Sequence, residues 1–328
     1  MIPFLLAGAG GIAALGGGLA AYSKSAARKI EKQVPRDGRL IDVDGETLHV
    51  AERGAGPPIV MIHGLGGQMR NFGKPMLEAL ERDYRLILVD RPGSGYSPRS
   101  AGRSARLNVQ AATIAALIRK LDLDRPLIVG HSLGGALALS LALNHPDTVG
   151  GLALIVPLTQ PQAIEDVPPV FKPLVIRSPA VRKAVAWTLA APMGMMKAEA
   201  AMKEIFAPEA VPQDFGVEGG GLLAVRPDNF YATSSDLIDL EGELEPMAEL
   251  YPTIKVPVSI LYARSDNLLD PKIHGEKTVS RIEGATLELA DGGHMLPFTQ
   301  PALAAAFVRR AAERLWAPEE PNVRLAAG

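Results

Sequence analysis

Short, continuously apolar runs recur along this chain of 328 residues and restrict it to a small set of folds. Segments with helical spacing separate most of these runs, and each run is too short to be a buried helix. Such runs are typical of strands that are buried on both faces of a parallel sheet. They lie at residues 58–62, 85–89, 127–129 and 152–156, and strand-like runs resume at residues 258–262 and 286–289. The alternation predicts an α/β fold with a mostly parallel, doubly wound sheet.

Turn and cap residues place further elements beside this sheet. Asp44-Gly45 is a strong two-residue turn signal and predicts a hairpin over residues 39–52. Asn108 is a suitable N-cap for a helix whose apolar residues recur at helical spacing. After the last apolar run, residues 301–315 favour a closing helix.

The regular alternation stops over residues 158–255. This stretch contains many prolines and no short apolar run. We expect it to be a mostly helical cap inserted into a core formed by residues 36–157 and 256–328. The methionine cluster in this stretch fits the lining of an acyl pocket, since Met adapts to varied apolar shapes, but the interior of the cap is the preferred interpretation. The cluster comprises Met193, Met195, Met196 and Met202.

The N-terminal stretch is unusually apolar. No charged side chain occurs from Ile2 to Tyr22, a length that can cross a bilayer as a helix. We therefore predict a single membrane span within residues 1–35. Basic residues directly behind it would keep the catalytic domain on the cytoplasmic side. The alternatives are a weak signal peptide, which implies a secreted or periplasmic protein, or a peripheral apolar tail.

Charge and cysteine content exclude several classes of function. The formal net charge is −2 and no long basic run occurs, which argues against nucleic-acid binding. Cysteine is absent, so disulfides, thiolate metal sites and cysteine nucleophiles are excluded. No pair of histidines or carboxylates has convincing metal-ligand spacing. We expect neither a metal nor a cofactor.

The sequence Gly130-His131-Ser132-Leu133-Gly134 fits G-x-S-x-G. An apolar run precedes it and an Ala- and Leu-rich helical segment follows it, which is the context in which this motif forms a sharp strand-to-helix turn. Such a turn lifts the serine hydroxyl above the sheet edge, and glycines are needed where a Cβ would clash. Ser132 is the candidate nucleophile.

A serine hydroxyl needs an adjacent base, itself held by an acid. His294 is the best base among the six histidines, because it follows an apolar run in a Gly-Gly-His loop, where α/β sites gather. Asp266 follows the preceding run and is the leading acid. Asp270 is the alternative, although its position before a proline suits a helix N-cap.

Together these motifs resemble the α/β-hydrolase superfamily over residues 39–157 and 256–316. The resemblance rests on His63-Gly64-Leu65-Gly66-Gly67, Asp90-Arg-Pro-Gly-Ser-Gly-Tyr-Ser97, Gly130-His-Ser-Leu-Gly-Gly135, the Asp266 loop and Gly293-His294. It implies that the amides of Leu65 and Leu133 form an oxyanion hole. It also implies that His63 braces its loop rather than transferring protons.

The leading hypothesis is a carboxylic-ester hydrolase with a Ser-His-Asp triad that acts on small lipophilic esters through an acyl-enzyme on Ser132. One alternative keeps the triad but cleaves C–C bonds or has a perhydrolase-like activity. Another is a membrane-tethered binding protein that kept the fold without turnover. The intact set of Ser132, Asp266 and His294 speaks against this last alternative.

Overall fold

The computed structural model describes the backbone of residues 2–316 and the side chains of residues 14–316. Its centre is one eight-stranded sheet, with strands β1 (Arg39–Val43), β2 (Glu46–Arg53), β3 (Pro58–Ile62), β4 (Arg85–Val89), β5 (Leu127–His131), β6 (Gly151–Ile155), β7 (Val258–Ala263) and β8 (Thr286–Ala290). The spatial order is β1-β2-β4-β3-β5-β6-β7-β8. β2 is antiparallel to β1 and β4, and every other adjacent pair is parallel. The predicted α/β fold is confirmed.

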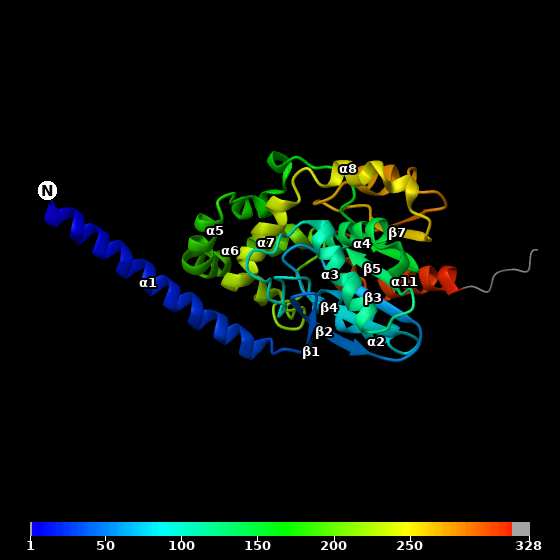
Figure 1. Ribbon diagram of the computed structural model, residues 1–328, viewed down its shortest axis with the longest axis horizontal. Coiled ribbons are helices and arrows are strands. Elements are labelled where there is room, and N and C mark those ends of the chain that lie inside the picture. The colour runs from blue at the N-terminus through cyan, green and yellow to red at the C-terminus, as the bar shows by residue number, and fades with distance from the viewer. Residues whose placement is uncertain (1, 317–328) are drawn as a thin grey trace, which may run out of the picture.

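Helices surround this sheet (Figure 1). The α-helices are α1 (Ile2–Gln33), α2 (Lys74–Leu80), α3 (Leu107–Lys120), α4 (Leu133–Asn144), α5 (Pro179–Val185), α6 (Ala191–Phe206), α7 (Pro227–Asp239), α8 (Leu244–Glu249), α9 (Lys277–Val279), α10 (Leu296–Thr299) and α11 (Pro301–Trp316). The short helical turns are η1 (Met69–Phe72), η2 (Pro146–Thr148), η3 (Ile164–Asp166), η4 (Pro169–Leu174), η5 (Ala186–Ala190), η6 (Gly221–Val225), η7 (Tyr251–Thr253) and η8 (Lys272–Glu276). α3 packs against α4, and α2 packs against α11.

The six apolar runs form β3 to β8, as the sequence predicts. Every residue of β5 and β6 is buried, because neighbouring strands and helices enclose these central strands. The predicted hairpin is also present: β1 pairs with β2, and Asp44 and Gly45 have φ values of 47° and 81°. Two positive φ angles are what a tight turn between twisted strands requires.

The predicted cap of α3 is wrong. The helix begins at Leu107, so Asn108 lies inside its first turn. The amide of Leu107 instead donates to Glu243 Oε2 over 2.7 Å. A carboxylate that is distant in sequence therefore satisfies the helix end, and it also suits the positive end of the helix dipole.

Between β6 and β7 the chain forms the helical elements η3 to η7 and α5 to α8, with no strand within this described stretch. The methionine cluster does not form its interior. Met193, Met195 and Met196 are 41%, 51% and 85% exposed. Phe206 and Phe215, with Met295 from beyond β8, make up a buried cluster there instead, against which Met202 packs.

The predicted membrane span is wrong. Within the described part of the chain, no helix is both long enough and apolar enough to cross a membrane. The side chains of residues 1–13, which form much of the predicted span, lie outside that part. Two further predictions depended on this span: a catalytic domain on the cytoplasmic side, and a membrane tether for the binding-protein alternative. Neither is supported once the span is rejected.

The second half of α1 packs on the segment between β6 and β7. It contacts η5, η6, α6 and α7 and lies at one side of the molecule (Figure 1). Ser23, Ala26 and Ile30 are buried there. Ile30 and Val34 form a small apolar cluster with Leu223 of η6. One face of this half, with Ala26 and Ile30, is therefore covered by the protein itself, whereas Tyr22 is 48% exposed.

Candidate active site

Ser132 occupies the junction between β5 and α4. Its φ of 54° and ψ of −121° form a backbone conformation that residues other than glycine rarely adopt. Such strain persists only where the surroundings impose it, and it gathers at functional sites. Here the Ser132 amide donates to the Ile155 carbonyl over 3.1 Å, which ties the turn to the end of β6. The predicted strand-to-helix turn is present.

The glycines of the motif permit a close approach between this turn and β3. A Cβ on Gly134 would lie 2.1 Å from the Ile62 carbonyl oxygen. A Cβ on Gly130 would lie 2.5 Å from the Gly134 carbonyl oxygen. Both neighbours are backbone atoms, so no side chain can rotate away. The two glycines thus allow the serine turn to sit directly against the carboxyl end of β3.

The structure brings Ser132, His294 and Asp266 together in one hydrogen-bonded chain. His294 Nε2 lies 2.9 Å from Ser132 Oγ, and His294 Nδ1 lies 2.8 Å from Asp266 Oδ2. An ionised carboxylate only accepts, so Nδ1 carries the proton and Nε2 is free to accept from the serine hydroxyl. Ser132 is partly accessible from the neighbouring cavity, whereas His294 is 5% exposed. The order of groups is that of a nucleophile, a base and an orienting acid.

Asp266 remains ionised although it is buried. Burial raises the pKa of its carboxyl, but the charge and hydrogen bond of His294 and the amides of Leu268 and Leu269 outweigh burial, so the pKa lies below its ordinary value. Those amides donate to Asp266 Oδ1 over 2.8 and 3.1 Å. Asp270 is exposed, and its Oδ1 accepts from the Lys272 amide. The geometry therefore favours Asp266 over Asp270.

His131 contacts the loop that carries His294. Its Nε2 lies 2.9 Å from the carbonyl oxygen of His294. Burial, with the neighbouring His294, lowers the pKa of His131 to about 3, so the ring is neutral and donates that bond. The sequence places His131 beside the nucleophile but gives no signal for this contact, which joins two separate loops.

Glu209 also holds the loop that carries His294. Its Oε1 accepts from the Gly293 amide over 3.1 Å. A Cβ on Gly293 would lie 2.2 Å from the Ala207 carbonyl oxygen, so this loop packs closely against residues 207–209. The sequence analysis missed Glu209, because nothing in the segment between β6 and β7 indicates which of its carboxylates turns inward.

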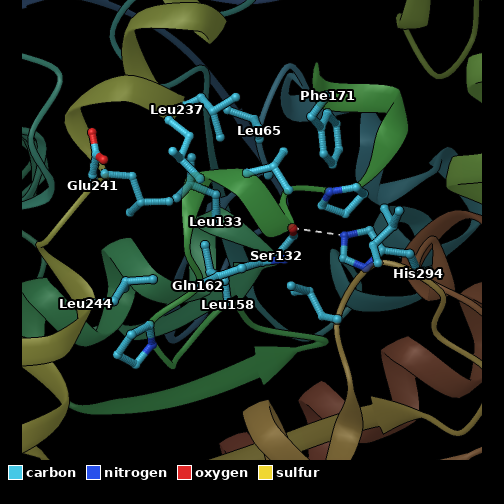
Figure 2. Close-up of a pocket in the computed structure, with 18 of the residues that line it drawn as sticks. Leu65, Ser132, Leu133, Leu158, Gln162, Phe171, Leu237, Glu241, Leu244 and His294 are labelled. Atoms are coloured by element: carbon cyan, nitrogen blue, oxygen red, sulfur yellow. Dashed lines mark hydrogen bonds between the residues drawn. The ribbon is translucent and has the colours of Figure 1, made fainter. Parts of the chain in front are cut away.

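Leu65 and Leu133, the predicted oxyanion residues, lie beside Ser132 on the same cavity (Figure 2). Leu133 is the first residue of α4, and a first-turn amide has no acceptor within its own helix. His63 braces the Leu65 loop: its Nδ1 donates to the Gly64 carbonyl and its Nε2 accepts from the Arg91 amide, each over 2.9 Å. The use of these two amides in binding an oxyanion stays a prediction.

The cavity beside Ser132 has a volume of about 410 Å³ and a mainly apolar wall. Figure 2 shows leucines and Phe171 around the serine and His294 at one end. The labelled apolar residues are Leu65, Leu133, Leu158, Phe171, Leu237 and Leu244. Among the described residues, three carboxylates but no lysine or arginine line the cavity. Those carboxylates belong to Glu165, Glu241 and Glu245.

Within residues 14–316 no group of three His, Asp or Glu side chains is arranged to hold a metal ion. The carboxylates and histidines nearest Ser132 are engaged with one another or with backbone amides, as described above.

Buried neutral histidines predict a loss of stability in mild acid. Burial lowers the pKa of His63 to about 4 and that of His274 to about 4, as it lowers that of His131 to about 3, whereas the unfolded value is 6.5. Between pH 4 and pH 6.5 the unfolded chain binds more protons than the folded chain. The free energy of unfolding is therefore highest above pH 6.5 and decreases as the pH drops towards 4. Each group contributes up to about 1.4 kcal/mol per pH unit.

Urea unfolding at pH 7.0, 6.0 and 5.0 measures this loss. We expect the midpoint to fall at each step, and the His274→Gln variant to fall less steeply than the natural chain. An unchanged midpoint between pH 7.0 and 5.0 would show that these rings are not held neutral.

Comparison with known proteins agrees with the fold and the motifs. A family model described as alpha/beta hydrolase fold matches residues 57–211. The magnesium-chelatase 30 kDa subunit of Rhodobacter capsulatus is 28% identical over 252 residues, 74% of this chain and 81% of the relative. The 2-hydroxy-6-oxo-2,4-heptadienoate hydrolase of a Pseudomonas putida strain is 32% identical over 120 residues, 36% of this chain and 44% of the relative.

Among solved structures, a thermophilic esterase from Thermogutta terrifontis has a similar fold, with a TM-score of 0.68 and 21% identity over 85% of this chain and 99% of that one. At this identity the likeness concerns the fold alone. The family model and the mostly parallel sheet with its serine turn at the carboxyl end of β5 lead to one conclusion. The chain has the α/β-hydrolase fold, and residues 57–211 match the family model of that fold.

Proposed function

We propose that this protein hydrolyses neutral, lipophilic carboxylic esters through an acyl-enzyme on Ser132. The observation that carries the proposal is the continuous hydrogen-bonded chain from Ser132 through His294 to Asp266 at one end of an apolar cavity.

In the first half of the reaction, Ser132 Oγ attacks the ester carbonyl carbon and His294 Nε2 takes the hydroxyl proton. The amides of Leu65 and Leu133 stabilise the resulting oxyanion; each such donor contributes about 2.7–4 kcal/mol when it is aimed at the transition state. When the intermediate collapses, the C–O bond to the alcohol breaks and His294 returns the proton to the leaving oxygen.

In the second half, His294 takes a proton from water, and the hydroxide formed attacks the acyl carbon. Collapse of the second intermediate releases the acid and returns a proton to Ser132 Oγ. Asp266 keeps His294 in the required tautomer throughout and stabilises its positive charge.

The wall of the cavity indicates the substrate class. Its leucines and Phe171 favour an apolar acyl or alcohol group. Its described lining holds three carboxylates and no lysine or arginine, which disfavours an anionic group there, although Arg177 from outside the lining pairs with Glu241. We further propose that residues 158–255 form a cap over a core of residues 36–157 and 256–328, because Phe171, Leu237 and Leu244 reach the cavity from that segment.

A panel of p-nitrophenyl esters tests the proposed function, with Ser132→Ala as the blank. We expect turnover above the blank, and a kcat/KM at least about tenfold higher for the hexanoate than for the monoester of adipate, which has the same length and a terminal carboxylate. The two substrates differ only in the terminal group, a methyl in the hexanoate and a carboxylate in the adipate monoester. Preference for the adipate monoester would contradict the substrate assignment.

Cleavage of a C–C bond is the second candidate, because one relative is named as a heptadienoate hydrolase. A vinylogous diketone with a carboxylate, offered beside the esters, separates the two reactions. Turnover of the diketone without turnover of any ester would replace the ester proposal. Failure of both substrate classes would reject hydrolysis through Ser132.

A further inference from the structure

Arg91 lies fully buried behind the loop that carries the Leu65 amide. Its Nε donates to the His63 carbonyl over 3.1 Å, and its Nη2 donates to the Gly64 carbonyl over 3.0 Å. A buried guanidinium is strongly destabilising unless its donors are paired. The pairing here directs two of those donors to consecutive carbonyls of one loop.

The Gly64 carbonyl and the Leu65 amide belong to the same peptide unit. That unit is planar and trans, so its N–H points away from its C=O, and fixing one fixes the other. Arg91 Nη2 at 3.0 Å, His63 Nδ1 at 2.9 Å and the Gly67 amide at 3.3 Å all converge on the Gly64 oxygen. Donors on a carbonyl also polarise its peptide, which makes the N–H a stronger donor.

Asp236 of α7 fixes the guanidinium from the other side. Its Oδ2 accepts from Arg91 Nη1 over 2.9 Å, and it is 2% exposed. Gln110 Oε1 accepts from the same nitrogen over 3.0 Å. Arg99 donates to the other Asp236 oxygen but has no recorded contact with the Leu65 loop. Asp236 therefore connects the segment between β6 and β7 to the Leu65 peptide through Arg91.

We propose that Arg91 is a positioning residue that aims and polarises the Leu65 amide for oxyanion binding, and that Asp236 holds it in place. The proposal rests on the proposed function, since it concerns the same site. It adds a cationic support behind one of the two oxyanion donors. It also links that donor to α7, whose neighbouring Leu237 lines the cavity.

Arg91→Gln tests this proposal. We expect kcat for p-nitrophenyl hexanoate to fall about tenfold to a hundredfold, below the loss found when an oxyanion donor is removed outright, with KM changed less than about threefold. Arg91→Lys keeps the charge but cannot span both carbonyls with a planar fork, so we expect an intermediate loss. Arg99→Gln is the matched control: it removes an ion pair of Asp236 and should keep kcat within about threefold.

A thionoester supplies a readout that simple damage to the fold would not move. Its sulfur accepts hydrogen bonds weakly, so only the oxygen ester benefits fully from the Leu65 amide. We expect the ratio of ester to thionoester kcat to fall in Arg91→Gln and to stay unchanged in Arg99→Gln. Circular dichroism establishes that each variant is folded. An unchanged ratio in folded Arg91→Gln would overturn the proposal.

If Arg91→Gln does not fold, Asp236→Asn provides a second test. Asparagine has nearly the same shape as aspartate but no charge, so this change weakens the ion pair that holds Arg91 in place. We expect the same fall in the ratio, at smaller amplitude, and an unchanged ratio would again overturn the proposal. If the natural chain turns over esters and the variants match it, only this inference fails. If the natural chain neither turns over esters nor reacts at Ser132, the proposed function fails and this inference with it.

Discussion

Replacement of Ser132 by alanine is expected to lower kcat for ester hydrolysis by about 10⁴- to 10⁶-fold. The reason is chemical: in the proposed reaction Ser132 Oγ, which lies 2.9 Å from His294 Nε2, is the atom that forms the acyl-enzyme. The remaining rate would come from binding and from the oxyanion donors acting on water. Initial rates with p-nitrophenyl hexanoate measure the loss.

The fold should tolerate this change. Alanine has the same backbone preferences as serine at the strained turn, and only the hydrogen bond to His294 is lost, which is worth about 1 kcal/mol. Ser280→Ala is the matched control, since Ser280 is exposed and its hydroxyl only caps its own turn. If Ser132→Ala keeps activity within tenfold of the natural chain, Ser132 is not the nucleophile.

Replacement of Gly134 by alanine is expected to lower the free energy of unfolding by more than about 3 kcal/mol and to abolish activity. The new Cβ would meet the Ile62 carbonyl oxygen at 2.1 Å and the His63 carbonyl oxygen at 2.7 Å. This clash is relieved only if α4 moves away from β3, and that movement would separate Ser132 from the Leu65 loop. Urea unfolding gives the change in stability, and ester turnover gives the change in activity.

Gly17→Ala is a matched control for that experiment. Gly17 lies in α1, and a Cβ there would have no atom within 4 Å. Alanine in a helix is favoured over glycine by about 0.5–1 kcal/mol, so the same substitution should leave stability unchanged or slightly higher. If Gly134→Ala were as stable and as active as Gly17→Ala, the close approach of the serine turn to β3 would be refuted.

The parts of the fold that local patterns specify could be predicted from the sequence. Strands buried on both faces need largely apolar runs, and such runs became β3 to β7, whereas the mixed run at 286–289 became the partly exposed edge strand β8. The carboxyl ends of parallel strands share one edge of the sheet. For that reason Ser132, Asp266 and His294, each of which follows such a strand, could be expected to meet.

Contacts made across the chain could not be predicted in this way. Glu243 satisfies the start of α3 in place of Asn108, and Asp236 reaches Arg91 from far along the sequence. Neither contact leaves a local signal, because a carboxylate that turns inward has the same sequence context as one in solvent. The N-terminal stretch gave a wrong prediction because an apolar run has the same sequence pattern whether or not it crosses a membrane. The later part of α1 packs on the segment between β6 and β7, while Leu15 and Tyr22 remain exposed.

Reaction with a fluorophosphonate followed by peptide mapping tests the nucleophile assignment most directly. The reagent phosphonylates an activated serine and leaves unactivated hydroxyls untouched. We predict one adduct per chain, on the peptide that contains Ser132, and none in Ser132→Ala. Absence of an adduct on the natural chain, or the same adduct on the alanine variant, would contradict the assignment of Ser132, His294 and Asp266 as a working hydrolytic site.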